Sequence, residues 1–187
     1  MALVPYLTPG QVDPEYRHLL ERPINLFRAL VNSPEALVNF HRLAEWIRWD
    51  CTLDARLREL LILQVGYVTG DEYEWSHHVI LSRQFGVTDA DVQGLIDLAD
   101  GNSTTLSALD QIVIGAATEI TQQLRVSDAT WAALSEHFDH CQLTDIVLIA
   151  AFYNMVVRVL GGLRVEVEPD WVEGLQRFPL RRARSLP

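Results

Sequence analysis

Two acidic residues and a histidine lie on one face of a predicted helix. Asp71, Glu74 and His78 are spaced i, i+3 and i+7, and side chains at this spacing lie on the same side of an α-helix. A fourth charged residue, Glu59, stands inside an almost wholly apolar segment that precedes this helix. Burying a carboxylate is costly unless it is paired or neutralised, so Glu59 needs a partner.

The glycine between these two segments predicts where that partner lies. Gly70 ends a helix predicted over 53–68, and a second helix is predicted over 72–85, so the two helices run antiparallel. Glu59 precedes Gly70 by eleven positions and His78 follows it by eight, which brings the two within about one helical turn, ~5.4 Å. Glu59, Glu74 and His78 can therefore converge. A carboxylate beside an imidazole suits proton transfer, because each group shifts the pKa of the other.

Each of these residues also has a structural interpretation. Glu59 could pair with Arg56 or Arg83, and Asp71 could be only a helix cap. The neighbouring residues Tyr73, Trp75 and His77 are more often packing residues than contacts to a substrate.

The same carboxylates and histidine form a weak candidate for a metal site. The sequence has no HExxH motif, and sites rich in carboxylates with a single histidine bind zinc poorly. The sequence therefore predicts neither a metal nor another cofactor.

Composition excludes several classes of function. The net charge is −10, which argues against nucleic acid as a partner because phosphate binding needs a basic face. All fifteen basic residues are arginine and none is lysine, which excludes Schiff-base chemistry and a P-loop. The two cysteines, Cys51 and Cys141, form no CxxC motif and are predicted to be small buried apolar residues rather than nucleophiles.

The same composition predicts a soluble cytoplasmic protein. No run approaches the ~18–20 apolar residues of a membrane-spanning helix, so no membrane partner is expected. The first residues lack the pattern of a secretory signal. The arginine-rich tail with Arg181, Arg182 and Arg184 is expected to be a solvated end.

The chain is predicted to be all-α, with about eight helices and a central antiparallel helix hairpin. Proline, serine, threonine and glycine punctuate apolar residues that recur every three to four positions. Thr52 is the expected cap of the helix over 53–68, the last long helix is expected over 143–160, and 165–167 is the only candidate strand. We expect an N-terminal helical extension (1–33), one domain (34–165) and a C-terminal tail (166–187).

The hairpin resembles the carboxymuconolactone decarboxylase / alkylhydroperoxidase-D-like superfamily. Members open the first helix with an Arg-Glu pair, here Arg58-Glu59, and turn at an Asn-Gly or Thr-Gly pair, here Thr69-Gly70. In the peroxidase branch Cys-x-x-Cys follows, and then a histidine four residues later. This chain has Asp71, Glu74 and His78 at those positions, so it resembles a cysteine-less branch. The segment 152–156, Phe-Tyr-Asn-Met-Val, also resembles the last helix of that branch.

The resemblance implies an alkylhydroperoxidase-D-like helical bundle and a site in the hairpin. A dithiol cycle cannot run without thiols at 71 and 74, because the thiolate is the nucleophile. The resemblance instead implies a cofactor-independent acid–base enzyme, a decarboxylase or related lyase or isomerase acting on a small carboxylated or lactone substrate. Its predicted catalytic residues are Glu59, His78 and Glu74. The predicted substrate contacts are Asp71, Tyr73, Trp75, His77 and Arg58.

The sequence is also compatible with two other functions. One is a peroxidase-like oxidative-stress protein, and the other is a protein that binds a small ligand without catalysis. An anionic substrate would need a local arginine, for which Arg48, Arg58 and Arg83 are the nearest candidates in sequence. The superfamily resemblance also implies a homo-oligomer, a trimer or a hexamer.

Overall fold

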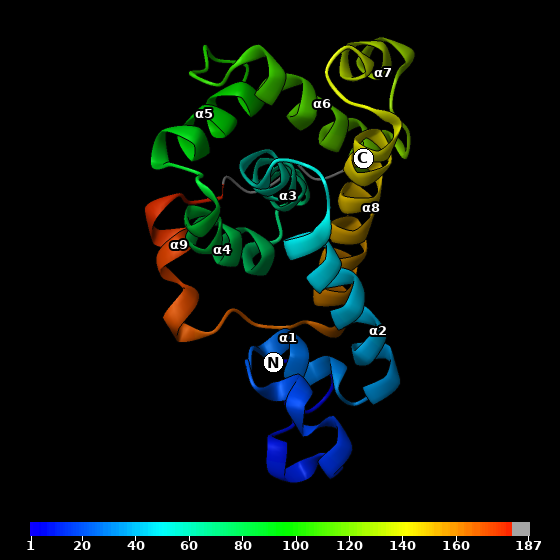
Figure 1. The fold of residues 1–187 in the computed structure, drawn as a ribbon. Coiled ribbons are helices and arrows are strands. Elements are labelled where there is room, and N and C mark those ends of the chain that lie inside the picture. The colour runs from blue at the N-terminus through cyan, green and yellow to red at the C-terminus, as the bar shows by residue number, and fades with distance from the viewer. Residues whose placement is uncertain (181–187) are drawn as a thin grey trace.

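The computed structural model describes residues 1–180, and within that range every regular element is helical (Figure 1). The predicted all-α class and central helix hairpin are confirmed. The described part has nine α-helices rather than about eight. They are α1 (Asn25–Leu30), α2 (Pro34–Glu45), α3 (Ala55–Thr69), α4 (Glu72–Leu81), α5 (Asp89–Ala99), α6 (Ala108–Gln123), α7 (Asp128–Ser135), α8 (His140–Leu163) and α9 (Glu173–Arg177).

Short 3-10 and π segments connect or extend these helices. The 3-10 segments are η1 (Pro9–Gln11), η2 (Pro14–Leu20), η4 (Ser82–Phe85) and η5 (Pro169–Trp171), and η3 (Trp46–Asp50) is a π-helix that continues α2. Residues 165–167, the candidate strand, form no regular element. The positions of Arg181, Arg182 and Arg184 lie outside the described residues.

Two helix starts differ from the prediction because local hydrogen bonds decide them. Asp54, not Thr52, caps α3, since its side chain accepts from the Leu57 amide. Thr52 instead donates from its amide and its hydroxyl to Asp145 Oδ2 on α8, at 3.0 Å each. The last long helix begins at His140 rather than 143, because Asp139 and Gln142 form a capping box there.

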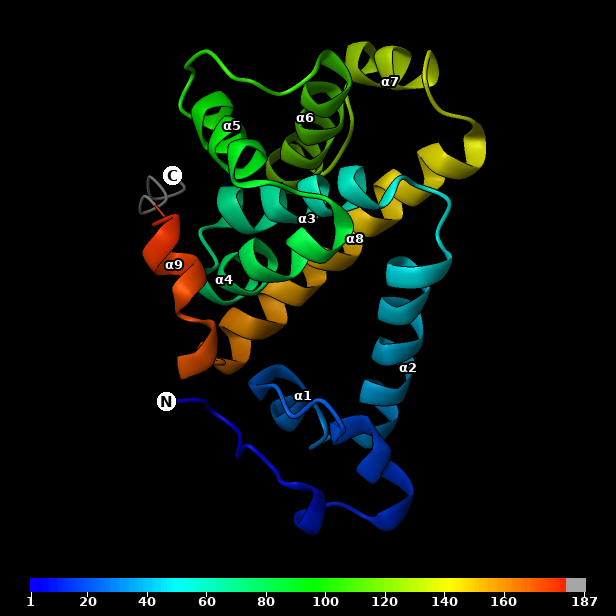
Figure 2. The same cartoon turned by 60° about the vertical axis from the view of Figure 1, so that its left-hand side comes forward.

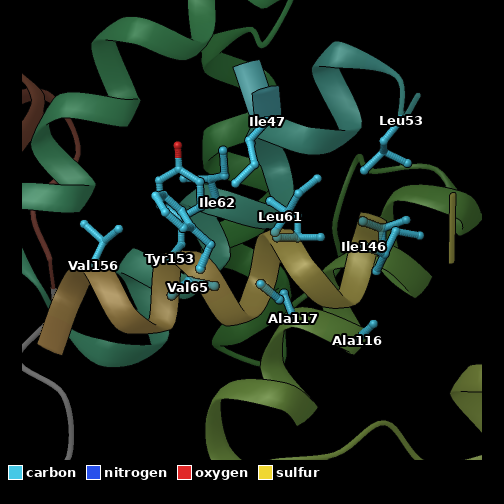
Figure 3. Packing of buried hydrophobic residues seen from close by; sticks show 14 of the residues in the cluster. Ile47, Leu53, Leu61, Ile62, Val65, Ala116, Ala117, Ile146, Tyr153 and Val156 are labelled. Carbon is cyan, nitrogen blue, oxygen red and sulfur yellow. The ribbon is translucent and has the colours of Figure 1, made fainter. Parts of the chain in front are cut away.

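Helix α3 is the centre of the molecule, and α4, α5, α6 and α8 pack around it (Figure 1). Its residues from Leu57 to Gly66 are all buried, as expected for a helix that is apolar nearly all round. Figure 3 shows the core between α3 and α8, where Ile62 and Val65 meet Tyr153 and Val156. The Tyr153 hydroxyl points away from α8 in this view.

The α3–α4 hairpin is tight because of two glycines. Gly70 ends α3 with φ 68°, a left-handed conformation that favours glycine. Gly66 lets the helices approach closely, since a Cβ there would lie 3.2 Å from the Trp75 amide nitrogen. Asp71 then caps α4 by accepting from the Glu74 amide at 2.8 Å. The turn thus fixes which residues of α3 lie opposite which residues of α4.

Both ends of the described chain cover one side of this hairpin. The segments η2, α1 and α2 form a layer with its own apolar cluster around Leu20, Val31 and Leu37 (Figure 2). After α8 the chain crosses beside α1 to η5 and α9, and α9 packs on α4 (Figures 1 and 2). Residues 1–33 and 166–180 are therefore in contact with the predicted central domain.

Helix α8 is long and apolar enough to cross a membrane, by its length and composition alone. It has 24 residues and a window of mean hydropathy 2.0, which contradicts the expectation that no segment approaches that length. Half of this window is buried, and α8 packs against α3 and α6. Its role as a core helix accounts for this composition.

Candidate active site

Glu59 and His78 are in contact between the two helices of the hairpin. His78 Nδ1 donates to Glu59 Oε2 at 2.8 Å, and both side chains are buried. Arg58 neutralises the other oxygen of Glu59, because Nε and Nη2 donate to Oε1 at 3.2 and 3.1 Å. The guanidinium of Arg58 also stacks over the Phe85 ring, 4.5 Å from its centroid. The partner that the buried Glu59 needs is therefore His78 together with Arg58, and not Arg56 or Arg83.

Glu74 extends this arrangement toward the surface of a pocket. Its Oε1 lies 3.0 Å from His78 Nε2, one turn along α4. The angle of this contact is not that of a hydrogen bond, so Oε1 is a buried oxygen without a hydrogen-bonding partner among residues 1–180. Arg58, Glu59, His78 and Glu74 thus form a row of alternating charge that ends in an incompletely bonded carboxylate.

The charges of the row set the protonation of its members. Burial lowers the pKa of His78, but the carboxylates of Glu74 and Glu59 more than offset this and raise it to about 9. Burial raises the pKa of Glu59, but the hydrogen bond and charge of His78, with Arg58, bring it below its usual range. At neutral pH Glu59 is therefore ionised and His78 is an imidazolium, a proton donor rather than a base.

These shifts predict how stability depends on pH. The folded pKa of His78, about 9, lies above its ordinary 6.5, so its stabilising contribution is complete below about pH 6.5 and is lost as pH rises through 9. The pKa of Glu59 lies below its ordinary 4.5, so its contribution is present above about pH 4.5 and is lost as pH falls further. We expect urea midpoints to fall on the alkaline side between about pH 7 and 9. The variant His78→Gln should remove much of this alkaline fall in the urea midpoint. If the midpoint of the variant fell with pH as steeply as that of the wild type, the raised pKa of His78 would be contradicted.

A small cavity opens beside Glu74 and His78. It has a volume of about 60 Å³, and Tyr73, His77 and Tyr153 also line it. The Tyr153 ring stands edge-on to the His78 ring at 5.2 Å. Its hydroxyl makes no hydrogen bond within the described chain. Burial, and then the carboxylates of Glu74 and Glu59, raise the pKa of Tyr153, so it stays protonated. The cavity therefore offers a carboxylate, an imidazolium and a phenol to a bound molecule.

His77 belongs to a second cluster on the other side of the cavity. Its ring is stacked between Tyr73 and Trp171, with centroids 4.2 Å from each. His77 Nε2 donates to Glu168 Oε2 at 2.7 Å, and the Tyr73 hydroxyl donates to Glu168 Oε1 at 2.9 Å. The Asn25 amide also donates to Glu168. Burial lowers the pKa of His77 despite the charge of Glu168, so this histidine is neutral near pH 7 and holds the chain after α8 against α4.

Three of the predicted substrate contacts, and the candidate arginine Arg83, lie away from this cavity. Trp75 is fully buried in the apolar cluster around Leu60 and Val79, where its Nε1 donates to the Phe178 carbonyl at 2.7 Å. Its role is therefore packing. Asp71 lies at the opposite end of the hairpin as a cap, and Arg83 pairs with Asp89 at 2.9 Å. Arg58 is buried and acts on Glu59 rather than on the cavity.

Tyr153, from α8, and Arg22, from the segment before α1, line the cavity but were not among the predicted site residues. Glu168, from the segment after α8, lies behind His77 and bonds to it, and it was not predicted either. Glu168 and Arg22 carried no sequence signal, because their spacing to the hairpin has no helical period. Tyr153 lies in the segment 152–156 that resembles the family, so that resemblance was a signal for it.

Metal-ligand geometry is absent from the described residues. Within residues 1–180, no group of three or more histidine, cysteine, aspartate or glutamate side chains is placed to hold a metal ion. Both ring nitrogens of His78 face carboxylates instead.

Comparisons with known proteins agree with this fold. Residues 34–108 match the model of the Carboxymuconolactone decarboxylase family. A protein described as an alkylhydroperoxidase AhpD core, an uncharacterized peroxidase-related protein from Ralstonia eutropha, superposes with a TM-score of 0.77 at 18% identity, over 92% of this chain and 96% of its own. No curated protein sequence matches the chain.

Two further solved structures have the same fold. A putative antioxidant defence protein AhpD from Agrobacterium tumefaciens gives a TM-score of 0.65 at 21% identity, over 74% of this chain and 94% of its own. A cysteine-to-alanine variant of the debrominase Bmp8, in complex with 2,3,4-tribromopyrrole, gives a TM-score of 0.78 at 16% identity. The superposition covers 94% of this chain and 97% of that protein. At these identities the likeness concerns the fold alone.

Proposed function

From the match of residues 34–108 to the Carboxymuconolactone decarboxylase family model and from the AhpD-like fold, we propose that the chain is a cofactor-independent acid–base enzyme of this superfamily. The proposed reaction is that of a decarboxylase or a related lyase or isomerase, on a small carboxylated or lactone substrate. The observation that carries this proposal is the buried row Arg58, Glu59, His78 and Glu74, whose last carboxylate reaches the cavity without a hydrogen-bonding partner in the described chain.

The row is suited to delivering one proton. In a decarboxylation the bond between the substrate carbon and its carboxylate breaks, carbon dioxide leaves, and the electron pair stays on the carbon, spread into a neighbouring carbonyl. The imidazolium of His78 then supplies a proton to that carbon, directly or through Glu74. Glu59 stabilises the imidazolium, and Arg58 holds Glu59 in its ionised state. His78 regains its proton from solvent, so no oxidant or reductant is required.

The first experiment is a screen for carbon dioxide release from small carboxylated lactones. We expect at least one of them to lose carbon dioxide and to take up one deuteron from D₂O at the carbon that carried the carboxylate. Isomerase activity would appear as deuterium exchange without carbon dioxide release. Binding of these compounds without turnover or exchange would instead identify a ligand-binding protein.

A thiol mechanism makes the opposite prediction about the cysteines. The prediction that both cysteines are buried was wrong: Cys51 is half-buried, with Sγ donating to the Ile47 carbonyl at 3.0 Å, and Cys141 is exposed in the first turn of α8. Neither lines the cavity beside His78. The double variant Cys51→Ser/Cys141→Ser is therefore expected to keep kcat/KM within about twofold, with some loss of stability from the half-buried Cys51. Thiol-dependent peroxide consumption that disappeared in this variant would contradict the acid–base mechanism.

We propose that the protein forms a homo-oligomer, a trimer or a hexamer. Leu148 and Met155 are exposed on one side of α8, and Trp131 is exposed on α7. Large apolar side chains gathered at a surface are typical of contact sites. Light scattering should therefore give a multiple of 21.2 kDa. A mass of one chain at micromolar concentration would contradict the prediction.

A further inference from the structure

Two arginines face the active-site region without an acidic partner. Arg22 and Arg48 form no ion pair within residues 1–180, whereas Arg56, Arg58, Arg83 and Arg177 all do. Burial, and then the charge of Arg48, lower the pKa of Arg22. Both side chains are half-buried and line the same space. Two neighbouring cations without a counter-charge repel each other, which favours the binding of an anion.

The two arginines stand at the boundary between two cavities. The inner cavity, of about 60 Å³, contains Glu74, His78 and Tyr153, and the outer cavity has a volume of about 490 Å³. Arg22 and Arg48 line both cavities. The acidic residues of the outer cavity, Glu21 and Glu45, are exposed and pair with neither arginine in the described chain. A molecule that extends from the outer cavity toward His78 would therefore lie beside both cations.

Irregular backbone positions both side chains. Arg48 lies in the π-helix η3, where the Cys51 amide donates to the Trp46 carbonyl at 2.9 Å. The Arg48 carbonyl accepts from Arg58 Nη1 at 2.7 Å, which joins this segment to the residue that holds Glu59. Single π-turns inside helices are frequent at functional sites.

Arg22 is held from another direction. It stands just before Pro23, at the break between η2 and α1, and its guanidinium lies over the Trp171 ring, 5.7 Å from the centroid. Trp171 in turn stacks on His77. The arginines therefore come from two separate segments, and each is connected to one side of the inner cavity.

We infer that Arg22 and Arg48 form a clamp for a carboxylate of the substrate, which places the rest of a small planar or cyclic molecule against Glu74 and His78. Two guanidinium groups suit a carboxylate, because their N–H groups pair with both oxygens. The clamp holds a carboxylate that keeps its charge. Binding the group that leaves as carbon dioxide would stabilise the ground state more than the transition state and slow the reaction. The role of the clamp in turnover rests on the proposed function, whereas anion binding does not.

The test compares benzoate with benzamide, a neutral molecule of the same shape, by ligand-observed NMR titration of the full-length protein. We expect the wild type to bind benzoate at least about tenfold more tightly than benzamide. Arg22→Gln and Arg48→Gln should each weaken benzoate binding by about 10–100-fold and leave benzamide unchanged, the range of a hydrogen bond to a charged group. The matched control is Arg42→Gln, an exposed arginine of the outer cavity only, which should change benzoate affinity by less than about threefold.

The outcomes separate this inference from the proposed function. Equal affinity for benzoate and benzamide, including no binding of either, would overturn the clamp, as would benzoate binding that survives in both folded arginine variants. If Arg22→Gln failed to fold because it loses the contact with Trp171, Arg48→Gln would decide the question. Arginine-dependent benzoate binding without turnover of any carboxylate would overturn the proposed function and leave the clamp in place.

Discussion

Replacing His78 with glutamine is expected to lower turnover by about 10²–10⁴-fold, the range that general acid–base catalysis supplies. Glutamine has similar bulk, and its amide can still donate to Glu59, but it carries no proton that it can release near neutral pH. The fold should therefore persist while proton delivery is lost. The measurement is kcat/KM on the substrate found by the carbon dioxide screen, with circular dichroism to show that the variant is folded.

The other members of the row should respond as one unit with His78. The charges of Glu74 and Glu59 together keep His78 protonated, so Glu74→Gln and Glu59→Gln each remove one of them, and Glu74→Gln also removes the carboxylate at the cavity. The double variant Glu59→Gln/His78→Gln should be about as slow as the slower single variant, because residues that act together are not additive.

A surface histidine provides the matched control for this series. His137→Gln, at an exposed position, should keep wild-type turnover. If His78→Gln and Glu59→Gln both turned over substrate at the wild-type rate, the hairpin would be a structural ion pair and the reaction would occur elsewhere.

Replacing Arg58 with methionine is expected to lower the free energy of unfolding by about 3–5 kcal/mol, the usual cost of removing one partner from a buried ion pair. Arg58 is only 3% exposed, and its guanidinium bonds to Glu59 Oε1 and to the Arg48 carbonyl. Methionine keeps an unbranched apolar side chain at this buried position but loses the guanidinium over Phe85 and leaves both acceptors without this donor. Urea denaturation at pH 7 measures the change.

Arg83 offers a control on an exposed ion pair. Its pair with Asp89 is about one third exposed on the arginine side, so Arg83→Met should cost less than about 1 kcal/mol. The double variant Arg58→Met/Glu59→Gln should recover part of the loss, because it removes the uncompensated charge together with its partner. If Arg58→Met were no more destabilising than Arg83→Met, the buried ion pair of Arg58 and Glu59 would contribute no more to stability than the exposed pair.

The sequence alone determined the helices and the contact at the centre of the site. Residues Glu59 and His78 are nineteen positions apart and are joined by one glycine turn, so helical geometry by itself brings them together. Thr88 and Ser127 cap α5 and α7 through equally local hydrogen bonds, because a side-chain cap acts over three residues. These features depend on local geometry, which a single sequence contains.

Only the tertiary structure decided which residues surround that contact. Trp75 and His78 are three positions apart on α4, yet Trp75 packs beneath Phe178 while His78 faces Tyr153, because α9 and α8 cover different sides of the helix. Arg22 lines the cavity, and Glu168 bonds to His77 behind it, and both are separated from the hairpin by many residues of intervening chain. Their placement results from how the layers pack on α3 and α4, and packing between distant segments leaves no period in the sequence from which it could be predicted.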